Sequence, residues 1–260
     1  TLVSTAAFAY LVYLFFGNAG RWFGGYFSYD WFILTVWAVV LHRRRQFAPA
    51  AACLAYAAMM RGFPGLLALY PAVQWIASVA RLRTPERRHT VFLVSLVLCC
   101  AAIFGATCLM RGGVVALEQW LDKLTVHRQQ HILTESRIGL QYLFAQNYGT
   151  DIWEVPIDVR EQLVRHYEPA YRVVALTLVA LSALAMLRRD DHDGLLLGLG
   201  VIFFTTVLSR YYFSLGALLL TWKTLDASRP TNSVSARYLF ALLALFAVQA
   251  AFPQVLARQR

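Results

Sequence analysis

The chain has 260 residues, of which 59% are hydrophobic and only 15% are charged. Soluble globular domains contain about 45–50% apolar and about 25% charged residues, so the composition argues against a soluble, disordered or fibrous chain. It predicts a polytopic membrane protein instead. The net charge of +10 does not favour nucleic acid, because the basic residues form short runs between apolar segments and no nucleic-acid-binding motif is present.

Nine apolar segments are predicted to be membrane helices. In chain order they are residues 2–17, 31–42, 47–60, 63–79, 90–110, 170–187, 195–209, 211–225 and 238–252. A membrane span needs about 20 apolar residues, and only residues 90–110 meet that length comfortably. The stretch 47–79 is broken by Arg61, Gly62 and Pro64, which predicts either two short helices or a re-entrant hairpin.

The distribution of basic residues orients these segments. Three residues, Arg21, Arg61 and Arg210, fall in the short loops of one side, which we take as outer. The loops of the other side contain many more, which by the positive-inside rule makes them cytoplasmic. These are Arg43, Arg44, Arg45, Arg81, Arg83, Arg87, Arg88, Arg188, Arg189, Lys223, Arg229 and Arg237.

One loop is much longer than the others and divides the chain into three predicted regions. Residues 1–110 and 170–260 hold the membrane segments, and residues 111–169 form an extracytoplasmic loop. Apolar residues recur at helical spacing from Val114 to Leu124, which predicts an amphipathic helix at the membrane surface. A second short helix is expected at 138–144, and a third from Pro156 to about His166. The predicted fold is an all-α transmembrane bundle of about eight or nine segments.

Ionisable residues at the outer ends of these segments are the candidate site residues. Arg61 beside a helix break suits a guanidinium that binds a phosphate, although an arginine at a hairpin tip also reaches the interface without function. Asp30 could act as a general base, or could simply cap the helix that begins at Trp31. Arg210, Tyr211 and Tyr212 suit a lipid headgroup or a sugar, or an interfacial belt.

Other polar groups give weaker signals. His127, His131 and Glu135 share a helical face, but without a second motif they do not define a metal site, so no metal ligand is assigned. The cluster at 190–193 (Asp-Asp-His-Asp) is interpreted as a solvated turn on the inner side. Four cysteines, all in apolar segments, form no Cys-x-x-Cys pair. Phosphate-binding Gly-Lys-Ser/Thr loops and Gly-x-Ser-x-Gly motifs are missing, which argues against ATP-driven transport and serine hydrolysis.

Three stretches together carry a family resemblance. Residues 29–73 contain an Asp-Trp helix start, a basic turn, a small-residue helix and Arg-x-Phe-Pro. Residues 120–144 (WLDKLTVHRQQHILTESRIGLQYLF) follow a long span, and residues 209–219 (SRYYFSLGALL) open a late helix with paired tyrosines. This pattern resembles the polytopic GT-C glycosyltransferases that use polyprenyl-phosphate sugars, in their bacterial mannosyltransferase-like and arabinofuranosyltransferase-like branches.

The resemblance implies an enzyme of the bacterial cytoplasmic (inner) membrane. It implies sugar transfer from a polyprenyl-phosphate donor to a glycan or lipid acceptor of the cell envelope, on the extracytoplasmic face. Arg61, Arg210 and the two tyrosines would bind the donor, and the loop with His127 and Arg137 would bind the acceptor or act as a gate. In that family the catalytic acid lies in the first outer loop. We expect the chain to be a fragment, so the base is either Asp30 or upstream of Thr1.

Other functions fit the same sequence. A polytopic transporter and a non-catalytic envelope assembly protein are the alternatives, and a ligase or polymerase of lipid-linked sugars is a neighbouring enzyme class. The spans after Thr90 carry few ionisable groups and no internal repeat is visible, which disfavours a transporter. No cofactor is assigned, and a divalent cation is left open. The expected partners are the bilayer, the donor and the acceptor, without nucleic acid.

Overall fold

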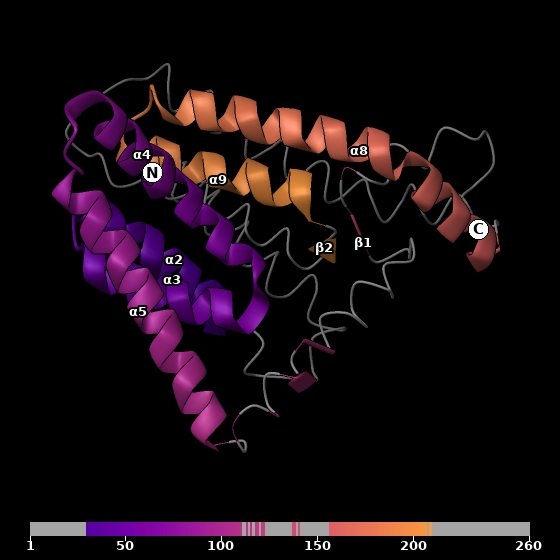
Figure 1. Cartoon of the computed structure of the whole chain (residues 1–260), viewed down its shortest axis with the longest axis horizontal. Coiled ribbons are helices and arrows are strands. Elements are labelled where there is room, and N and C mark those ends of the chain that lie inside the picture. Colours follow the sequence, from indigo (N-terminus) through magenta and orange to yellow (C-terminus); the bar gives the residue numbers. More distant parts are fainter. Residues whose placement is uncertain are drawn as a thin grey trace, which may run out of the picture. The chain divides into compact units, whose positions relative to one another are not determined.

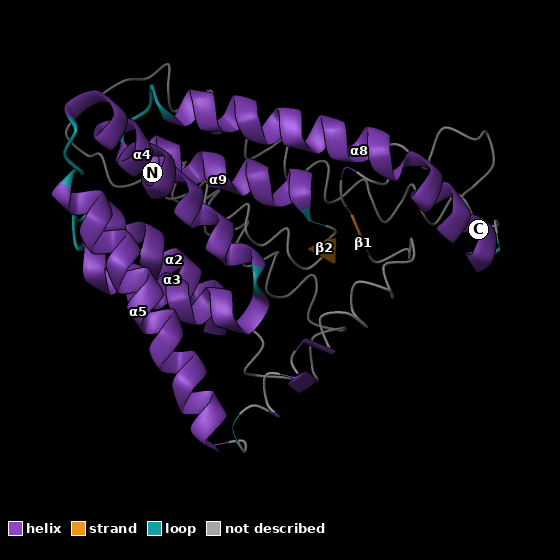
Figure 2. Cartoon of the chain, viewed as in Figure 1, coloured by secondary structure: helices purple, strands orange, loops and turns teal. Residues whose placement is uncertain are grey.

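The computed structural model describes residues 30–110, 113, 115, 118–119, 121–122, 137–138, 140, 156–206 and 208–209. By its internal contacts the chain divides into two units, Thr1–Ser28 with Tyr211–Arg260, and Tyr29–Arg210. All described residues belong to the second unit. Within them the predicted all-α fold is confirmed, apart from one pair of two-residue strands (Figure 2).

The first two described helices form an antiparallel hairpin. Helix α2 (Asp30–Arg43) and helix α3 (Phe47–Arg61) are joined by a tight turn in which the Gln46 N–H donates to the carbonyl of Leu41 at 2.9 Å. The face of α3 towards the core consists mainly of alanines, which let the two backbones approach closely. Its buried residues are Ala50, Ala51, Leu54, Ala55 and Ala57.

The predicted break after α3 is present. Gly62 ends the helix with φ 73°, a conformation that glycine adopts at low cost. A 3-10 helix, η3 (Phe63–Ala68), follows with Pro64 in its first turn, and α4 (Leu69–Leu82) continues from it. The structure therefore has two short helices and a 3-10 connection here, and η3 with α4 forms one helical stretch of 20 residues, Phe63–Leu82.

Helix α5 (Arg87–Met110) has 24 residues and contains the longest apolar run of the sequence. It contacts α3 and α4, and Phe92 near its start is 1% exposed. Most of its remaining length is exposed and apolar, as a helix in contact with lipid would be. Figure 1 shows α2, α3 and α5 side by side.

Helix α8 (Ile157–Met186) runs without interruption for 30 residues and contains Pro169. We expected a loop helix ending near His166, and that prediction was wrong, because the helix continues through the proline. The ion pair from Arg172 to Glu168, at 2.5 Å, spans the proline on an exposed face and supports the helix where a backbone hydrogen bond is lost.

Helix α9 (Asp191–Thr205) returns beside α8 and packs on η3, α4 and α2 (Figure 1). Two glycines make this packing possible. A Cβ on Gly198 would lie 3.1 Å from the backbone Cα of Leu67, and one on Gly194 would lie 2.0 Å from the ring of Tyr70. The backbone of α9 therefore lies against the backbone of η3 at Gly198 and against the Tyr70 ring of α4 at Gly194.

After α9, the chain pairs with the long segment that precedes α8. Strand β1 (Arg137–Ile138) is antiparallel to β2 (Leu208–Ser209). Ile138 was expected to begin a helix, and its place in β1 corrects that expectation. The described residues Val115, 118–119 and 121–122 are helical, in agreement with the predicted amphipathic helix.

Three described helices are long and apolar enough to cross a membrane: Phe63–Leu82, Arg87–Met110 and Glu161–Met186. Two shorter apolar helices, Phe47–Arg61 and Asp193–Thr205, accompany them. These findings support a membrane protein. The predicted segments 2–17, 211–225 and 238–252 lie outside the described residues.

Candidate functional site

The antiparallel α2–α3 hairpin brings two of the predicted site residues to the same end of the unit. Asp30 begins α2 and Arg61 ends α3. The ring of Trp31, next to Asp30, lies 5.3 Å from the ring of Phe63, two residues after Arg61, in an edge-to-face contact. We call this end, with Asp30, Tyr56 and Arg61, the outer end.

Asp30 has two hydrogen-bond partners there. One carboxylate oxygen accepts the backbone N–H of Trp31 at 2.7 Å, and the other accepts the hydroxyl of Tyr56 at 2.9 Å. The Trp31 N–H is one of the backbone donors that lack a partner within the helix, and Asp30 satisfies it. The predicted capping role of Asp30 therefore accounts for one of its two hydrogen bonds. The Tyr56 contact is exposed and was not anticipated, because it joins residues 26 positions apart.

Arg61 is exposed at the end of α3. Within the described residues no carboxylate forms an ion pair with its guanidinium. The outer end therefore combines a hydrogen-bonded carboxylate with an exposed cation that has no acidic partner in this part of the chain. A carboxylate can accept a proton and a guanidinium can bind a phosphate, so each of the two groups is a candidate for contact with a ligand.

The remaining predicted site residues are only partly described. The backbone of Arg137 pairs with Ser209, the residue before Arg210, so β1 and β2 bring the long segment to the chain that follows α9. Side chains at this ladder lie outside the described residues, as do His127, Arg210, Tyr211 and Tyr212.

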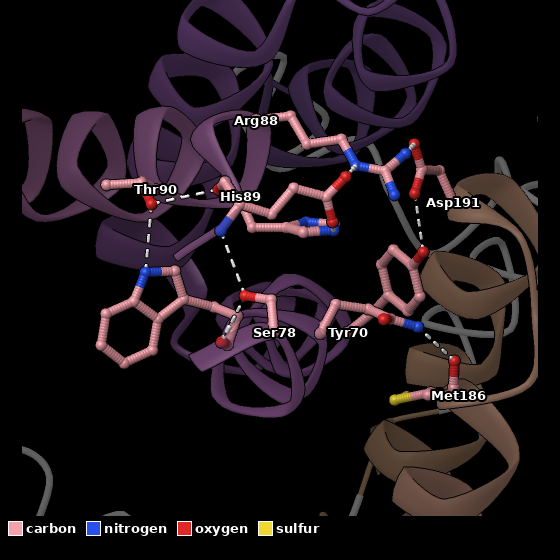
Figure 3. Close-up of polar contacts among 10 residues, drawn as sticks. Tyr70, Ser78, Arg88, His89, Thr90, Met186 and Asp191 are labelled. Carbon is pink, nitrogen blue, oxygen red and sulfur yellow. Dashed lines mark hydrogen bonds and ion pairs between the residues drawn. The ribbon is translucent and has the colours of Figure 1, made fainter. Parts of the chain in front are cut away.

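A second polar cluster lies where the turns 44–46, 83–86 and 187–190 meet, which we call the inner end. Asp191 accepts hydrogen bonds from the hydroxyl of Tyr70 at 2.7 Å and from the guanidinium of Arg88 at 2.5 Å (Figure 3). Arg88 also lies 2.6 Å from Glu86, and the Glu86 N–H donates to the hydroxyl of Ser78 at 3.1 Å. These contacts tie α4, α5 and α9 together.

The prediction that residues 190–193 form a solvated turn was therefore wrong for Asp191, whose side chain is 22% exposed. It holds for Asp190, which is exposed and caps α9 by accepting the Asp193 N–H at 3.0 Å. Asp191 lies 103 positions from Arg88 and 121 from Tyr70, and no local pattern in the sequence reports a contact at such separation.

Two buried histidines fill the space behind this cluster. His42 is 1% exposed, and its ring lies 5.3 Å from that of Phe92 and 6.3 Å from that of Tyr70. His89 is completely buried, 5.9 Å from the ring of Tyr70, with its Nε2 3.4 Å from a Glu86 oxygen. The contacts of His42 bring the α2 turn against α5, so the basic turns converge at one end.

Metal ligands do not gather in the described part of the chain. Among those residues no group of three His, Cys, Asp or Glu side chains is placed to hold a metal ion. The predicted loop cluster of His127, His131 and Glu135 lies outside them.

Comparison of the chain with protein-family models, curated proteins and solved structures gives no match. The resemblance to GT-C glycosyltransferases therefore depends on the sequence pattern alone.

Proposed function

We propose that the chain acts as a multi-pass glycosyltransferase of the bacterial cytoplasmic membrane. It transfers a sugar from a polyprenyl-phosphate donor to a cell-envelope glycan or lipid acceptor on the extracytoplasmic face. Arg61 binds the donor phosphate and Asp30 is the general base. Arg137, Arg210, Tyr211, Tyr212 and His127 are the proposed further substrate contacts.

The arrangement of the outer end is the observation that carries this proposal. The α2–α3 hairpin holds Asp30 and Arg61 at one end, and the Trp31–Phe63 ring contact links the segments that bear them. The Tyr56 hydroxyl donates to Asp30 at 2.9 Å and fixes the orientation of the carboxylate. A base and a phosphate-binding cation in one neighbourhood are what transfer from a phosphate-linked sugar requires.

The proposed reaction is a displacement at the anomeric carbon. The acceptor hydroxyl gives its proton to the Asp30 carboxylate, and its oxygen forms the new bond to the anomeric carbon. The bond between that carbon and the phosphate oxygen breaks, and the polyprenyl phosphate leaves with the electron pair. The Arg61 guanidinium stabilises the negative charge that develops on the departing phosphate. The membrane setting suits a donor whose lipid is already in the bilayer.

The experiment measures sugar transfer by the full chain in nanodiscs, from radiolabelled polyprenyl-phosphate mannose and arabinose. Loss of the phosphate-binding cation in Arg61→Ala is expected to lower kcat about 100-fold or more. Asp30→Asn is expected to lower it by about 10²–10⁴-fold. Arg165→Ala is the matched control, since Arg165 is an exposed arginine on α8; it should keep wild-type activity.

A folded wild-type protein that transfers no sugar from either donor would contradict the proposal. Full activity in Asp30→Asn would show that Asp30 is not the base. The proposed donor site would then be tested by Arg61→Ala alone. Donor flux across sealed proteoliposomes without transfer would instead identify a transporter.

A further inference from the structure

The inner end presents an unusually dense group of exposed cations. Four helix ends contribute them, from α2, α4, α5 and α8. The exposed members are Arg44, Arg45, Arg81, Arg83, Arg87, Arg188 and Arg189. In the part of the chain that the structure describes, none of these seven forms an ion pair with an acidic side chain. Of the acids at this end, Glu86 and Asp191 are held by Arg88, and Asp190 and Asp193 lie at the start of α9, so the cations outnumber the acids.

Two of these arginines occupy a backbone conformation that favours glycine. Arg45 has φ 59° and Arg83 has φ 55°, and they are the two non-glycine residues with positive φ among the described residues. Arg83 ends α4, where its N–H donates to the Val79 carbonyl at 3.0 Å, and Arg45 closes the turn after α2. Glycine is the usual residue at such positions because it has no Cβ. The chain therefore carries a charged side chain at two turns where a glycine would be the less strained choice.

Exposed apolar side chains lie directly beside the cations. Leu82, between two of the arginines, is 69% exposed, and Leu184, one helical turn before Arg188, is 60% exposed. A soluble acidic protein or a nucleic acid would contact the charges and leave these leucines in water. A phospholipid offers both a phosphate for the guanidinium and an acyl chain for the leucine.

We propose that the inner end binds the phosphate groups of anionic phospholipids, and that Arg45 and Arg83 are kept at strained turn positions because they make these contacts. This surface is separate from the proposed catalytic end and does not depend on it. The surface lies on the side that the positive-inside rule assigns to the cytoplasm, and the leaflet on that side of a bacterial membrane contains anionic lipids.

The experiment uses the full chain in nanodiscs of phosphatidylcholine alone or with phosphatidylglycerol. Bound lipid is counted by native mass spectrometry, and the thermal midpoint is measured in both compositions. The double variant Arg45→Gly/Arg83→Gly is compared with the wild type. A basic side chain near an anionic surface is worth about fivefold in binding, so losing two should weaken phosphatidylglycerol binding about 30-fold.

The sign of the stability change separates this role from a purely structural one. In phosphatidylcholine the glycine variant should melt at or above the wild-type temperature, because the turn strain is relieved. In phosphatidylglycerol it should lose the stabilisation that the wild type gains. Arg45→Lys/Arg83→Lys, which keeps the charge, should retain most of that gain. Arg165→Ala, at an exposed site on α8, should retain all of it.

Several results would overturn the proposal. Equal wild-type binding to both nanodiscs would do so, as would a glycine variant that melts lower in phosphatidylcholine and keeps its response to phosphatidylglycerol. Stabilisation by polyglutamate but not by phosphatidylglycerol would assign the surface to an acidic protein. An equal effect of inorganic phosphate would show that lipid is not required.

Discussion

The outer and inner ends of this helical unit use the same types of side chain in different ways. At the inner end Asp191 is bonded to both Tyr70 and Arg88, and the three groups join α4, α5 and α9. At the outer end Asp30 is bonded to an exposed Tyr56, and Arg61 has no acidic partner among the described residues. Paired groups between packed helices stabilise a fold, whereas exposed groups with spare bonding capacity remain free for a ligand.

The comparison teaches that charge alone does not identify a binding site. From the sequence, Asp30 is interpreted as a base or a helix cap and the 190–193 cluster as a solvated turn, yet both place an aspartate in the first turn of a helix. Their difference comes from what packs opposite them. Four pairs of substitutions, in order of decreasing effect, test whether the Asp191 cluster of the inner end is structural and the outer end is free.

The largest effect on stability is expected from Gly194→Ala. The new Cβ would lie 2.0 Å from the Tyr70 ring, which is 1% exposed and therefore has little room to move. Displacing that ring also breaks its bond to Asp191. We expect a loss of about 1–3 kcal/mol in the free energy of unfolding, measured by denaturation in detergent micelles.

Gly105→Ala is the matched control for that experiment. Gly105 lies inside α5, and a Cβ there would meet nothing within 4 Å. Because alanine is the better helix former, the variant should be more stable by about 0.5–1 kcal/mol. Equal behaviour of the two variants would show that the contact between α9 and Tyr70 is not tight.

The next largest effect comes from exchanging aspartate for asparagine at each end. Asp191→Asn weakens two hydrogen bonds to a charged acceptor and should cost about 1–2 kcal/mol. We keep the value low because the Arg88 side chain is 39% exposed and water screens the ion pair. Asp30→Asn should change stability by less than about 0.5 kcal/mol, while it lowers the rate of the proposed transfer by about 10²–10⁴-fold. Chemical denaturation measures the loss of stability, and the transfer assay measures the loss of activity. A larger stability loss in Asp30→Asn than in Asp191→Asn would refute the assignment of the two ends.

A smaller effect is expected when each aspartate loses its tyrosine partner. Tyr70→Phe removes a part-buried hydroxyl and leaves one Asp191 bond unmade, at a cost of about 1 kcal/mol. Tyr56→Phe removes an exposed hydroxyl, and water can replace it at Asp30 with a change under about 0.5 kcal/mol. The test compares the thermal midpoints of the two variants. A larger drop in the midpoint for Tyr56→Phe than for Tyr70→Phe would mean that the outer end also supports the fold.

The smallest effect is expected on the exposed face of α8. Glu168→Gln breaks the ion pair with Arg172, whose side chain is 59% exposed, and should cost about 0.3–0.5 kcal/mol. Glu161→Gln breaks a longer pair of 3.6 Å to Arg165 and should cost less. Repeating the thermal melts in high salt should remove both differences, because exposed pairs are screened. Persistence of either effect in salt would indicate a structural role that the geometry does not show.

Much of the helical pattern was predictable from local sequence. The apolar run at 90–110 became α5, and the break at Arg61 and Gly62 became the end of α3. Both signals are local, because apolar length and the freedom of glycine act within a few residues. The expected helix end near His166 was wrong, and α8 continues through Pro169, although a proline usually ends or kinks a helix.

By itself, the sequence determined an apolar helical chain with one strongly basic set of turns, since hydropathy and charge are sums over neighbouring residues. Tertiary structure decided which polar groups meet. It placed Asp191 against Tyr70 and Arg88, paired Arg137 with Ser209, and brought the Tyr56 hydroxyl to Asp30. These contacts depend on how closely the helices pack, and that depends on the alanines of α3 and the glycines of α9, where the missing side chains let the backbones touch.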